Sequence, residues 1–143
     1  MTEADIKEVN IKYVEGMLFS ARTDSGHEVL MDADPKFGGA DKGPRPMDLL
    51  LAGLGGCTAM DIISILKKKK QEVTGLEIKV KGERAPEHPK KYTGIELEFR
   101  VKGKNISEDA VKRAVGLSMD KYCSAKATIE GGAKVTYAYR IEE

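Results

Sequence analysis

The chain has 143 residues, 41% of them hydrophobic and 33% charged, which suits one domain that can bury a core without disulfides. Lys and Arg number 24 against 23 Asp and Glu, and the net charge of +1 removes the electrostatic case for a dedicated nucleic-acid-binding protein. Hydrophobic residues recur along the whole chain without blocks of Pro, Ser or Gln, so a disordered protein is also excluded. We therefore expect a single domain over residues 1–143.

The sequence carries no signal for secretion. Residues 1–5 are acidic and lack the basic and apolar regions of a leader peptide. The longest apolar stretch, residues 49–66, is interrupted by three glycines, Thr58 and Asp61, which disfavours a membrane span. We expect a cytoplasmic protein without a membrane partner. Its two cysteines, Cys57 and Cys123, would then meet a reducing compartment, where a thiol pair is more often buried, metal-bound or redox-active than a permanent disulfide.

Three strands are predicted in the first third of the chain. Apolar and polar residues alternate over residues 9–13, which indicates a strand with one buried face. The same alternation returns over residues 17–22, and a third strand is expected over residues 27–31 after a glycine-containing turn. Residues 32–45, with two prolines and three glycines, are expected to form a loop.

A long helix is predicted over residues 47–66. Pro46 suits its first turn, and Lys67–Lys70 suit its end, where cations favour the negative pole of the helix dipole. Its apolar residues cover nearly every side, which is typical of a helix buried all round. Because one small domain cannot easily wrap such a helix, we expect a partner subunit to cover part of it. The lysine run could also contact nucleic acid or an anionic membrane, but a solvated helix end is favoured by the matching acidic content.

The second half of the chain predicts two strands, a helix and a last strand. Alternation places the strands at residues 76–81 and 95–101, and the last one at residues 135–141. Between them, Asn105 or Ser107 caps a helix that ends near Cys123. Its expected buried stripe is Val111, Ala114, Val115, Ser118 and Tyr122. The order βββ-α-ββ-α-β predicts an α+β fold with mainly antiparallel sheets around a long central helix.

The region before Cys57 is rich in glycine. Gly53, Gly55 and Gly56 stand inside the predicted helix, where each glycine costs about 1 kcal/mol relative to alanine. This choice predicts that a partner helix or a small ligand approaches the backbone closely. A buried, inert cysteine with tight helix packing explains the same pattern equally well.

The cysteine pair admits several kinds of chemistry. Two thiols in a reducing compartment fit a peroxidatic and a resolving cysteine. A metal site is disfavoured, because His27 and His88 are the only other soft ligands and no CxxC or HxxxH spacing exists. A cysteine protease is disfavoured because no triad signature accompanies His27. The absence of a nucleotide or flavin motif predicts no bound cofactor.

Residues 43–57, GPRPMDLLLAGLGGC, resemble the central-helix signature of the OsmC/Ohr family, the osmotically inducible and organic-hydroperoxide-resistance proteins. Residues 121–124, KYCS, are similar to the second-cysteine site of that family, and the hairpin at residues 19–32 resembles its N-terminal hairpin. The resemblance runs from about Ile11 to Tyr139. It implies an intertwined homodimer, in which two central helices pack between sheets built from both chains.

The resemblance implies thiol-dependent reduction of peroxides, organic hydroperoxides especially. Cys57 would be the peroxidatic residue and Cys123 the resolving one, with a dithiol or a small thiol as reductant. Attack on a peroxide requires the thiolate, which a nearby cation favours. By its place in the hairpin, Arg22 is the counterpart of the family's hairpin arginine, which a carboxylate would orient.

One position departs from the hydroperoxide-specific branch. That branch has Glu ten residues before its first cysteine, whereas Met47 stands there in this chain and Asp48 follows it. A regular helix puts Asp48 opposite Cys57, so either the glycines distort the helix, or Asp48 acts through the adjoining subunit, or it only favours the helix dipole. Arg45 is a second candidate cation. The departure indicates the OsmC-like branch, with Arg45, Met47 and Gly56 as candidate substrate-binding residues.

A second class of function remains open. The chain would then be a non-catalytic dimeric stress protein, with structural cysteines and a cleft for a small apolar ligand. Oxidation of the thiols by peroxide separates the two hypotheses.

Overall fold

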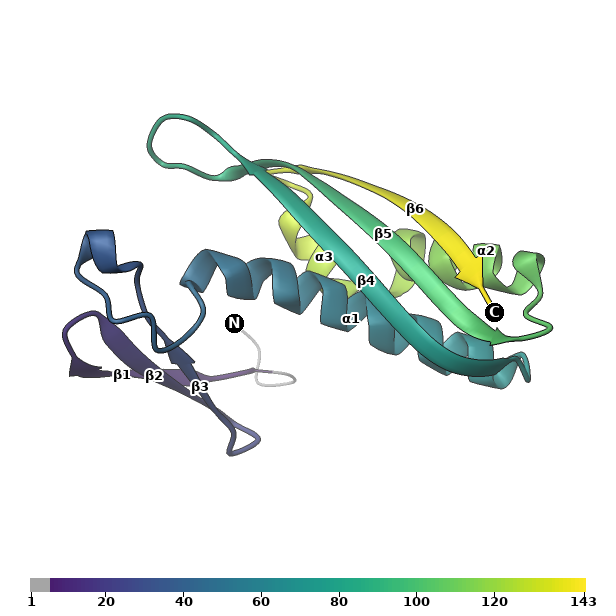
Figure 1. Cartoon of the computed structure of the whole chain (residues 1–143), viewed down its shortest axis with the longest axis horizontal. Helices are drawn as coiled ribbons and strands as arrows, with labels where there is room; N and C mark the ends of the chain where they lie inside the picture. Colours follow the sequence, from purple (N-terminus) through teal and green to yellow (C-terminus); the bar gives the residue numbers. More distant parts are fainter. Residues whose placement is uncertain (1–5) are drawn as a thin grey trace. The chain divides into compact units, whose positions relative to one another are not determined.

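The computed structural model describes residues 6–143, and it is an α+β protein (Figure 1). In chain order its elements are β1 (Val9–Glu15), β2 (Leu18–Thr23), β3 (Glu28–Met31), the 3-10 helix η1 (Pro35–Phe37), α1 (Pro46–Lys68), β4 (Glu72–Arg84), β5 (Tyr92–Lys104), α2 (Glu108–Leu117), the π-helix η2 (Ser118–Tyr122), α3 (Ser124–Ile129) and β6 (Lys134–Glu142). By its internal contacts the chain forms two compact units, an N-terminal unit that ends at Leu50 and a C-terminal unit that begins at Leu51. The expected element order is confirmed, with η1, η2 and α3 in addition.

The N-terminal unit contains a three-stranded antiparallel sheet in the order β1-β2-β3. Leu18 and Ala21 of β2 are buried. The prediction that β1 has one buried face is wrong for this chain, because all seven of its residues are exposed, Ile11 by 51% and Tyr13 by 63%. The alternation that indicated the strand is present, but no element of the described chain covers its apolar side.

The loop after β3 is organised around Asp32, which is only 2% exposed. Its carboxylate accepts hydrogen bonds from the backbone N–H groups of Ala33, Ala40 and Lys42, at 2.7, 3.2 and 3.1 Å. Burial by itself would raise the pKa of Asp32, but these hydrogen bonds and the charge of Arg45 outweigh it, so the pKa is lowered. Asp32 therefore holds the loop as an anion, a role that its sequence context did not reveal.

Helix α1 begins at Pro46 and ends at Lys68, which confirms the helix and both of its end signals. Five of its residues are buried: Leu54, Gly55, Thr58, Ile62 and Leu66. The expectation of burial all round is wrong for the single chain, because Leu50 is 48% and Met60 is 76% exposed. One chain supplies a sheet for one face of the helix only, and cover by a partner subunit stays a prediction.

Length and composition alone would also allow α1 to cross a membrane, with a mean hydropathy of 1.9 over its most apolar 18 residues. Its buried residues recur at intervals of four, from Leu54 to Thr58, Ile62 and Leu66, along a single face. That face packs in the core of the C-terminal unit, so the helix has the contacts of a core element.

The C-terminal unit has a second sheet, in the order β4-β5-β6. Its strands include the predicted segments but are several residues longer. Strands β4 and β5 pair antiparallel, with Ile78 opposite Phe99, whereas β6 pairs parallel to β5, with Tyr139 opposite Phe99. The parallel pair needs a long crossover, and α2, η2 and α3 supply it by returning the chain to the end of the sheet at which β5 begins.

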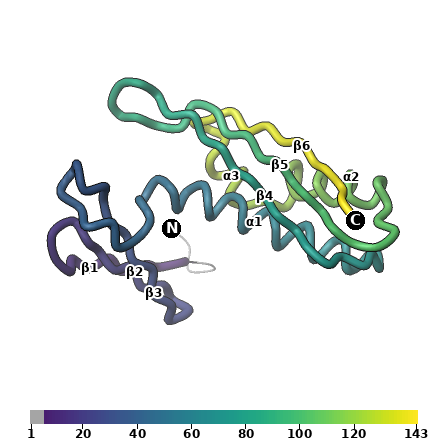
Figure 2. The backbone as a smooth tube through the Cα atoms, in the orientation of Figure 1, coloured from purple at the N-terminus to yellow at the C-terminus, as the bar shows by residue number. Residues whose placement is uncertain are grey.

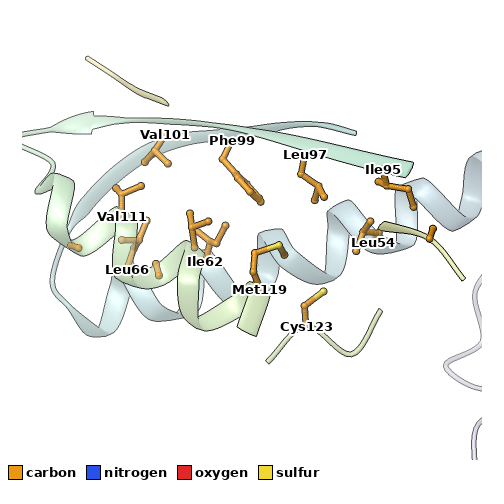
Figure 3. Close-up of a cluster of buried hydrophobic side chains, with 14 residues drawn as sticks. Leu54, Ile62, Leu66, Ile95, Leu97, Phe99, Val101, Val111, Met119 and Cys123 are labelled. Carbon is orange, nitrogen blue, oxygen red and sulfur yellow. The ribbon is translucent and has the colours of Figure 1, made fainter. Parts of the chain in front are cut away.

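Helices α1, α2 and α3 lie on the same face of this sheet (Figure 2). Side chains of β5 point from the sheet toward α1 and toward the segment from α2 to η2 (Figure 3). The fully buried core residues include Leu54, Ile62, Leu66, Leu97, Phe99, Val101, Val111 and Val115. Cys123 lies at the edge of this core and is 4% exposed (Figure 3).

The helical segment after β5 is interrupted before Cys123. Ser107 is the N-cap of α2, and its Oγ accepts a hydrogen bond from the N–H of Ala110 at 3.2 Å. In η2 the N–H of Cys123 donates to the carbonyl oxygen of Ser118 at 2.8 Å, five residues back. This wider turn rotates Tyr122 off the buried stripe, and its 49% exposure corrects the prediction that it packs in the core.

Candidate functional site

The two cysteines lie together in the C-terminal unit. The Sγ atoms of Cys57 and Cys123 and a carboxylate oxygen of Asp61 are all within 4.8 Å of one another. Cys57 and Asp61 are four residues apart on α1, so they share one face of the helix. Cys123 follows η2 in an extended conformation, with φ −74° and ψ 101°, and it starts α3 as its N-cap. We call Cys57, Asp61 and Cys123 the thiol–carboxylate cluster.

The two thiols differ in exposure. Cys57 is half-buried, whereas Cys123 is 4% exposed, and neither is in a disulfide. A small molecule from solvent can therefore reach the first thiol, while the protein shields the second one. The sequence predicts both cysteines as a pair but does not distinguish their exposure.

Cys123 has polar partners on both sides. Oγ1 of Thr58, itself buried, lies 3.3 Å from Sγ of Cys123 and donates its own proton to the carbonyl oxygen of Leu54 at 2.9 Å. Because a hydroxyl has one proton, this oxygen is left as the acceptor for the S–H group of Cys123. The backbone N–H of Lys126 also donates to Sγ, at 3.4 Å.

Burial raises the pKa of the Cys123 thiol, and the neighbouring Cys57 raises it further. The hydroxyl of Thr58, which can turn to donate to an ionised sulfur, and the N–H of Lys126 both lower this pKa, but they do not outweigh burial. Cys123 is therefore a protonated thiol at neutral pH.

Asp61 is oriented by a buried hydroxyl. Oγ of Ser118, in η2, donates a hydrogen bond to Oδ2 of Asp61 at 2.8 Å, and Ser118 is completely buried. Neither role is predicted from the sequence, in which Asp61 only interrupts the apolar helix and Ser118 belongs to the packing stripe of the second helix. The spacing of four residues between Cys57 and Asp61 was the available signal.

The cluster borders a cleft of about 420 Å³ in the same unit. Asp61 lies on its wall with Ile65, Leu117 and Tyr122, and Lys68 and Lys69 follow at the end of α1. The cleft gives a solvent path to the carboxylate of Asp61.

The glycines around Cys57 differ in their surroundings. A Cβ atom on Gly55 would lie 3.0 Å from Cγ2 of Val80, so α1 approaches β4 closely at this point. A Cβ atom on Gly53 or on Gly56 would meet nothing within 4 Å in the described chain. The close approach that the sequence predicts is therefore found at Gly55 alone, and Gly56, a candidate substrate-binding residue, faces open space.

The first candidate cation, Arg22, belongs to β2 of the N-terminal unit and is exposed. Its Nη1 donates to the carbonyl oxygen of Gly26 at 3.3 Å. Within residues 6–143 its guanidinium forms no ion pair, so most of its donors remain available.

The second candidate, Arg45, is engaged by carboxylates of its own unit. Its guanidinium lies 2.8 Å from Asp41 and 3.8 Å from Asp34, and it donates to the carbonyl oxygen of Gly43 at 3.1 Å. The hydrogen bond to Asp41 raises the pKa of Arg45 above its ordinary value.

Asp48 has the contacts of a residue in the first turn of a helix. Its Oδ2 accepts a hydrogen bond from the backbone N–H of Arg45 at 3.1 Å, just before α1 begins. This contact matches the third explanation given above, a carboxylate that favours the positive pole of the helix dipole. Met47, the neighbouring candidate, is half-buried.

Comparison with known proteins adds independent information. Residues 39–138 match the family of OsmC-like proteins. Protein YhfA of Escherichia coli is 40% identical over 134 residues, which cover 94% of this chain and 97% of the relative.

Solved structures show the same fold. The crystal structure of a hypothetical protein from Aquifex aeolicus has a TM-score of 0.80 at 37% identity and covers 97% of this chain and 99% of its own. An organic hydroperoxide resistance protein from Legionella pneumophila has a TM-score of 0.70 at 14% identity, with 96% and 98% covered. At that identity the likeness concerns the fold alone.

Proposed function

Because this chain belongs to the OsmC-like protein family, we propose that it is a thiol-dependent peroxidase that reduces organic hydroperoxides in defence against oxidative stress. The observation that carries the proposal is the pairing of a solvent-accessible thiol, Cys57, with a shielded thiol, Cys123, within 4.8 Å. The name of the Legionella pneumophila protein, which shares the fold, supports the same chemistry.

In the first step, the thiolate of Cys57 attacks the distal oxygen of the hydroperoxide. The O–O bond breaks, the sulfur is oxidised by two electrons to a sulfenic acid, and the alkoxide takes up a proton and leaves as the alcohol. Cys57 takes this role because it is the thiol that a substrate can reach.

In the second step, the sulfur of Cys123 displaces the hydroxyl group of the sulfenic acid. A disulfide forms, and the thiol proton leaves with the hydroxyl group as water. A disulfide bond is about 2.0 Å long, so the two sulfur atoms must approach by less than about 3 Å. The extended backbone of Cys123, between η2 and α3, allows this movement without unwinding either helix, and π-helical turns are frequent at functional sites. A dithiol or a small thiol then reduces the disulfide by exchange.

The thiolate of Cys57 needs a cation. Within residues 51–143 no ion pair reaches Asp61, and the hydrogen-bond partners of Cys123, the Thr58 hydroxyl and the N–H of Lys126, are neutral. We assign this role to Arg22 rather than Arg45. Arg45 is already paired with Asp41 and Asp34, whereas the guanidinium of Arg22 keeps donors free for an anion.

We also infer that the protein works as a homodimer. The uncovered face of α1, with Leu50 and Met60, and the exposed apolar residues of β1 are the surfaces that a second copy would bury. A single chain leaves these side chains in water, which costs stability that association recovers.

The proposal is tested by peroxide consumption with purified variants and a dithiol reductant. Cys57→Ser abolishes consumption of an alkyl hydroperoxide and keeps the fold, whereas the control Ala59→Ser, two residues further on the same helix, keeps the wild-type rate. Cys123→Ser gives one turnover per chain and leaves Cys57 as a sulfenic or more highly oxidised acid, seen in the intact mass. Full activity in Cys57→Ser, or no thiol oxidation by peroxide in the wild type, would assign the chain to the non-catalytic class instead.

A further inference from the structure

We propose that the thiol–carboxylate cluster of Cys57, Asp61 and Cys123 is a binding site for one zinc ion in the reduced protein. From the sequence a metal site is disfavoured, because His27 and His88 are the only other soft ligands and no local ligand spacing exists. Cys57 and Cys123 are 66 residues apart along the chain. The fold nevertheless brings both thiols and the carboxylate of Asp61 within 4.8 Å of one another. This inference concerns metal binding and goes beyond the peroxidase activity.

The distances suit zinc after a small contraction. Zn–S bonds of about 2.3 Å and Zn–O bonds of about 2.0–2.2 Å in a tetrahedron place neighbouring ligand atoms about 3.6–3.8 Å apart. The three atoms of the cluster must therefore approach one another by about 1 Å or less. Cys57 and Asp61 are fixed on one helical face. Cys123 is an extended residue before α3, so its sulfur can move toward them without a change in either helix.

The charge of the cluster also favours a divalent cation. Two thiolates and a carboxylate would carry three negative charges, and within residues 51–143 no cationic side chain forms an ion pair with Asp61. The cluster is hydrogen-bonded to the hydroxyls of Thr58 and Ser118 and to the backbone N–H of Lys126, all of which are neutral. A Zn²⁺ ion would neutralise most of this charge, and it would replace the two thiol protons.

The ligands are oriented as metal ligands usually are. Ser118 donates to the Oδ2 of Asp61 at 2.8 Å, which leaves Oδ1 for a metal. The N–H of Lys126 donates to Sγ of Cys123 at 3.4 Å, and the hydroxyl of Thr58 lies 3.3 Å from the same sulfur. Outer partners of this kind hold ligand side chains in place, and their removal typically weakens metal affinity about 10–100-fold.

The donor set selects the metal. Thiolates favour Zn²⁺ over Mg²⁺ and Ca²⁺, which prefer oxygen ligands only. Three protein ligands leave a fourth position, and the half-buried Cys57 and the cleft beside Asp61 give water and the ion a path to it. Zinc at this site would occupy both sulfur atoms, so the zinc-bound chain and the disulfide-bonded chain exclude one another.

The test is a titration of the reduced, metal-free chain with Zn²⁺ in the presence of a chromogenic chelator. The wild type binds one zinc ion per chain. Asp61→Asn keeps the shape and the acceptor for Ser118 but lowers the affinity at least tenfold, and Ser118→Ala lowers it about tenfold. The control Asp109→Asn, an exposed carboxylate at the start of α2, leaves the affinity unchanged.

Cobalt provides a second readout that does not depend on stability. Co²⁺ added to the wild type gives the near-ultraviolet charge-transfer absorption of two thiolate ligands, and Cys123→Ser gives about half of that intensity. Equal zinc affinity in the wild type and in Cys57→Ser/Cys123→Ser, or unchanged affinity in Asp61→Asn, overturns the inference. Peroxide consumption is measured separately in metal-free buffer, so a chain that binds zinc without reducing peroxide refutes the proposed function and leaves this inference standing.

Discussion

The Oγ1 atom of Thr58 lies 3.3 Å from the Sγ atom of Cys123, and both residues are buried. This contact joins α1 to Cys123, the extended residue between η2 and α3, which lies 65 residues further along the chain. Thr58 donates its own proton to the carbonyl oxygen of Leu54, so the S–H group of Cys123 donates to Oγ1 of Thr58. This hydrogen bond orients the thiol toward α1.

Thr58→Val therefore separates the two oxidation steps. Valine keeps the shape but removes the acceptor, so we expect a loss of about 1 kcal/mol in the free energy of unfolding. The reaction of Cys57 with peroxide keeps its rate, while formation of the disulfide slows severalfold because Cys123 is no longer oriented. Stopped-flow detection of the sulfenic acid measures both steps. The control Thr128→Val removes a similar hydroxyl, which donates to the carbonyl of Ser124 on exposed α3, and leaves both rates unchanged.

We expect Arg22→Ala to slow the reaction of Cys57 with an alkyl hydroperoxide more than tenfold at pH 7, because it removes the cation that we propose for the thiolate. Arg22→Lys restores only part of the rate, since an ammonium supplies charge without the planar fork of donors. The rate is measured by stopped-flow under single-turnover conditions. Arg113→Ala, a change at an exposed arginine of α2, serves as the control. If Arg22→Ala reacts at the wild-type rate, Arg45 becomes the candidate for the cation that favours the Cys57 thiolate.

The raised pKa of Cys123 predicts a loss of stability at alkaline pH. The folded chain keeps this thiol protonated, whereas the unfolded chain ionises it near the ordinary cysteine pKa of about 8.5. The contribution to the free energy of unfolding is therefore complete below about pH 8 and decreases as the pH rises from about 8.5 toward the folded-state pKa.

The measurement compares urea unfolding of Cys57→Ser with that of Cys57→Ser/Cys123→Ser between pH 7 and pH 10. The difference isolates Cys123, because the two variants differ at this residue alone. We expect the advantage of the variant that retains Cys123 to shrink steadily above about pH 8.5. A difference that is constant over this range contradicts the prediction.

A charge at Met60 tests whether the protein forms a homodimer. It is 76% exposed in the single chain, so Met60→Glu would be neutral in a monomer. In a dimer that covers this face of α1, the same change buries an unpaired charge and either dissociates or unfolds the protein. Sedimentation velocity and circular dichroism follow the two outcomes. Lys112→Glu, an exposed change on α2, leaves the sedimentation coefficient as in the wild type, and a 15.6 kDa species in the wild type itself would refute the dimer.

Local signals in the sequence were sufficient for the six strands and for α1 and α2, but not for η1, η2 and α3. The start and end of α1 follow from Pro46 and the lysine run, because the helix dipole and the missing N–H of proline act within one turn. The strands follow from alternation, since side chains of a strand point to opposite faces in turn. The direction of β6 was not predictable in this way, because it depends on the end of the sheet to which the helical connection returns the chain.

Part of the candidate site could be identified from the sequence, and part only from the tertiary structure. The sequence alone identified Cys57 and Cys123 as a pair, through the types of residue and the resemblance of the segments around them. The four-residue spacing places Asp61 beside Cys57 on one helical face, but only the tertiary structure brings Ser118 to Asp61, because this hydrogen bond joins residues 57 positions apart and no local pattern encodes it. The π-helical turn η2 also depends on the tertiary structure, because it forms where two helices pack on one sheet. It rotates Tyr122 outward and leaves Cys123 as an extended residue between η2 and α3.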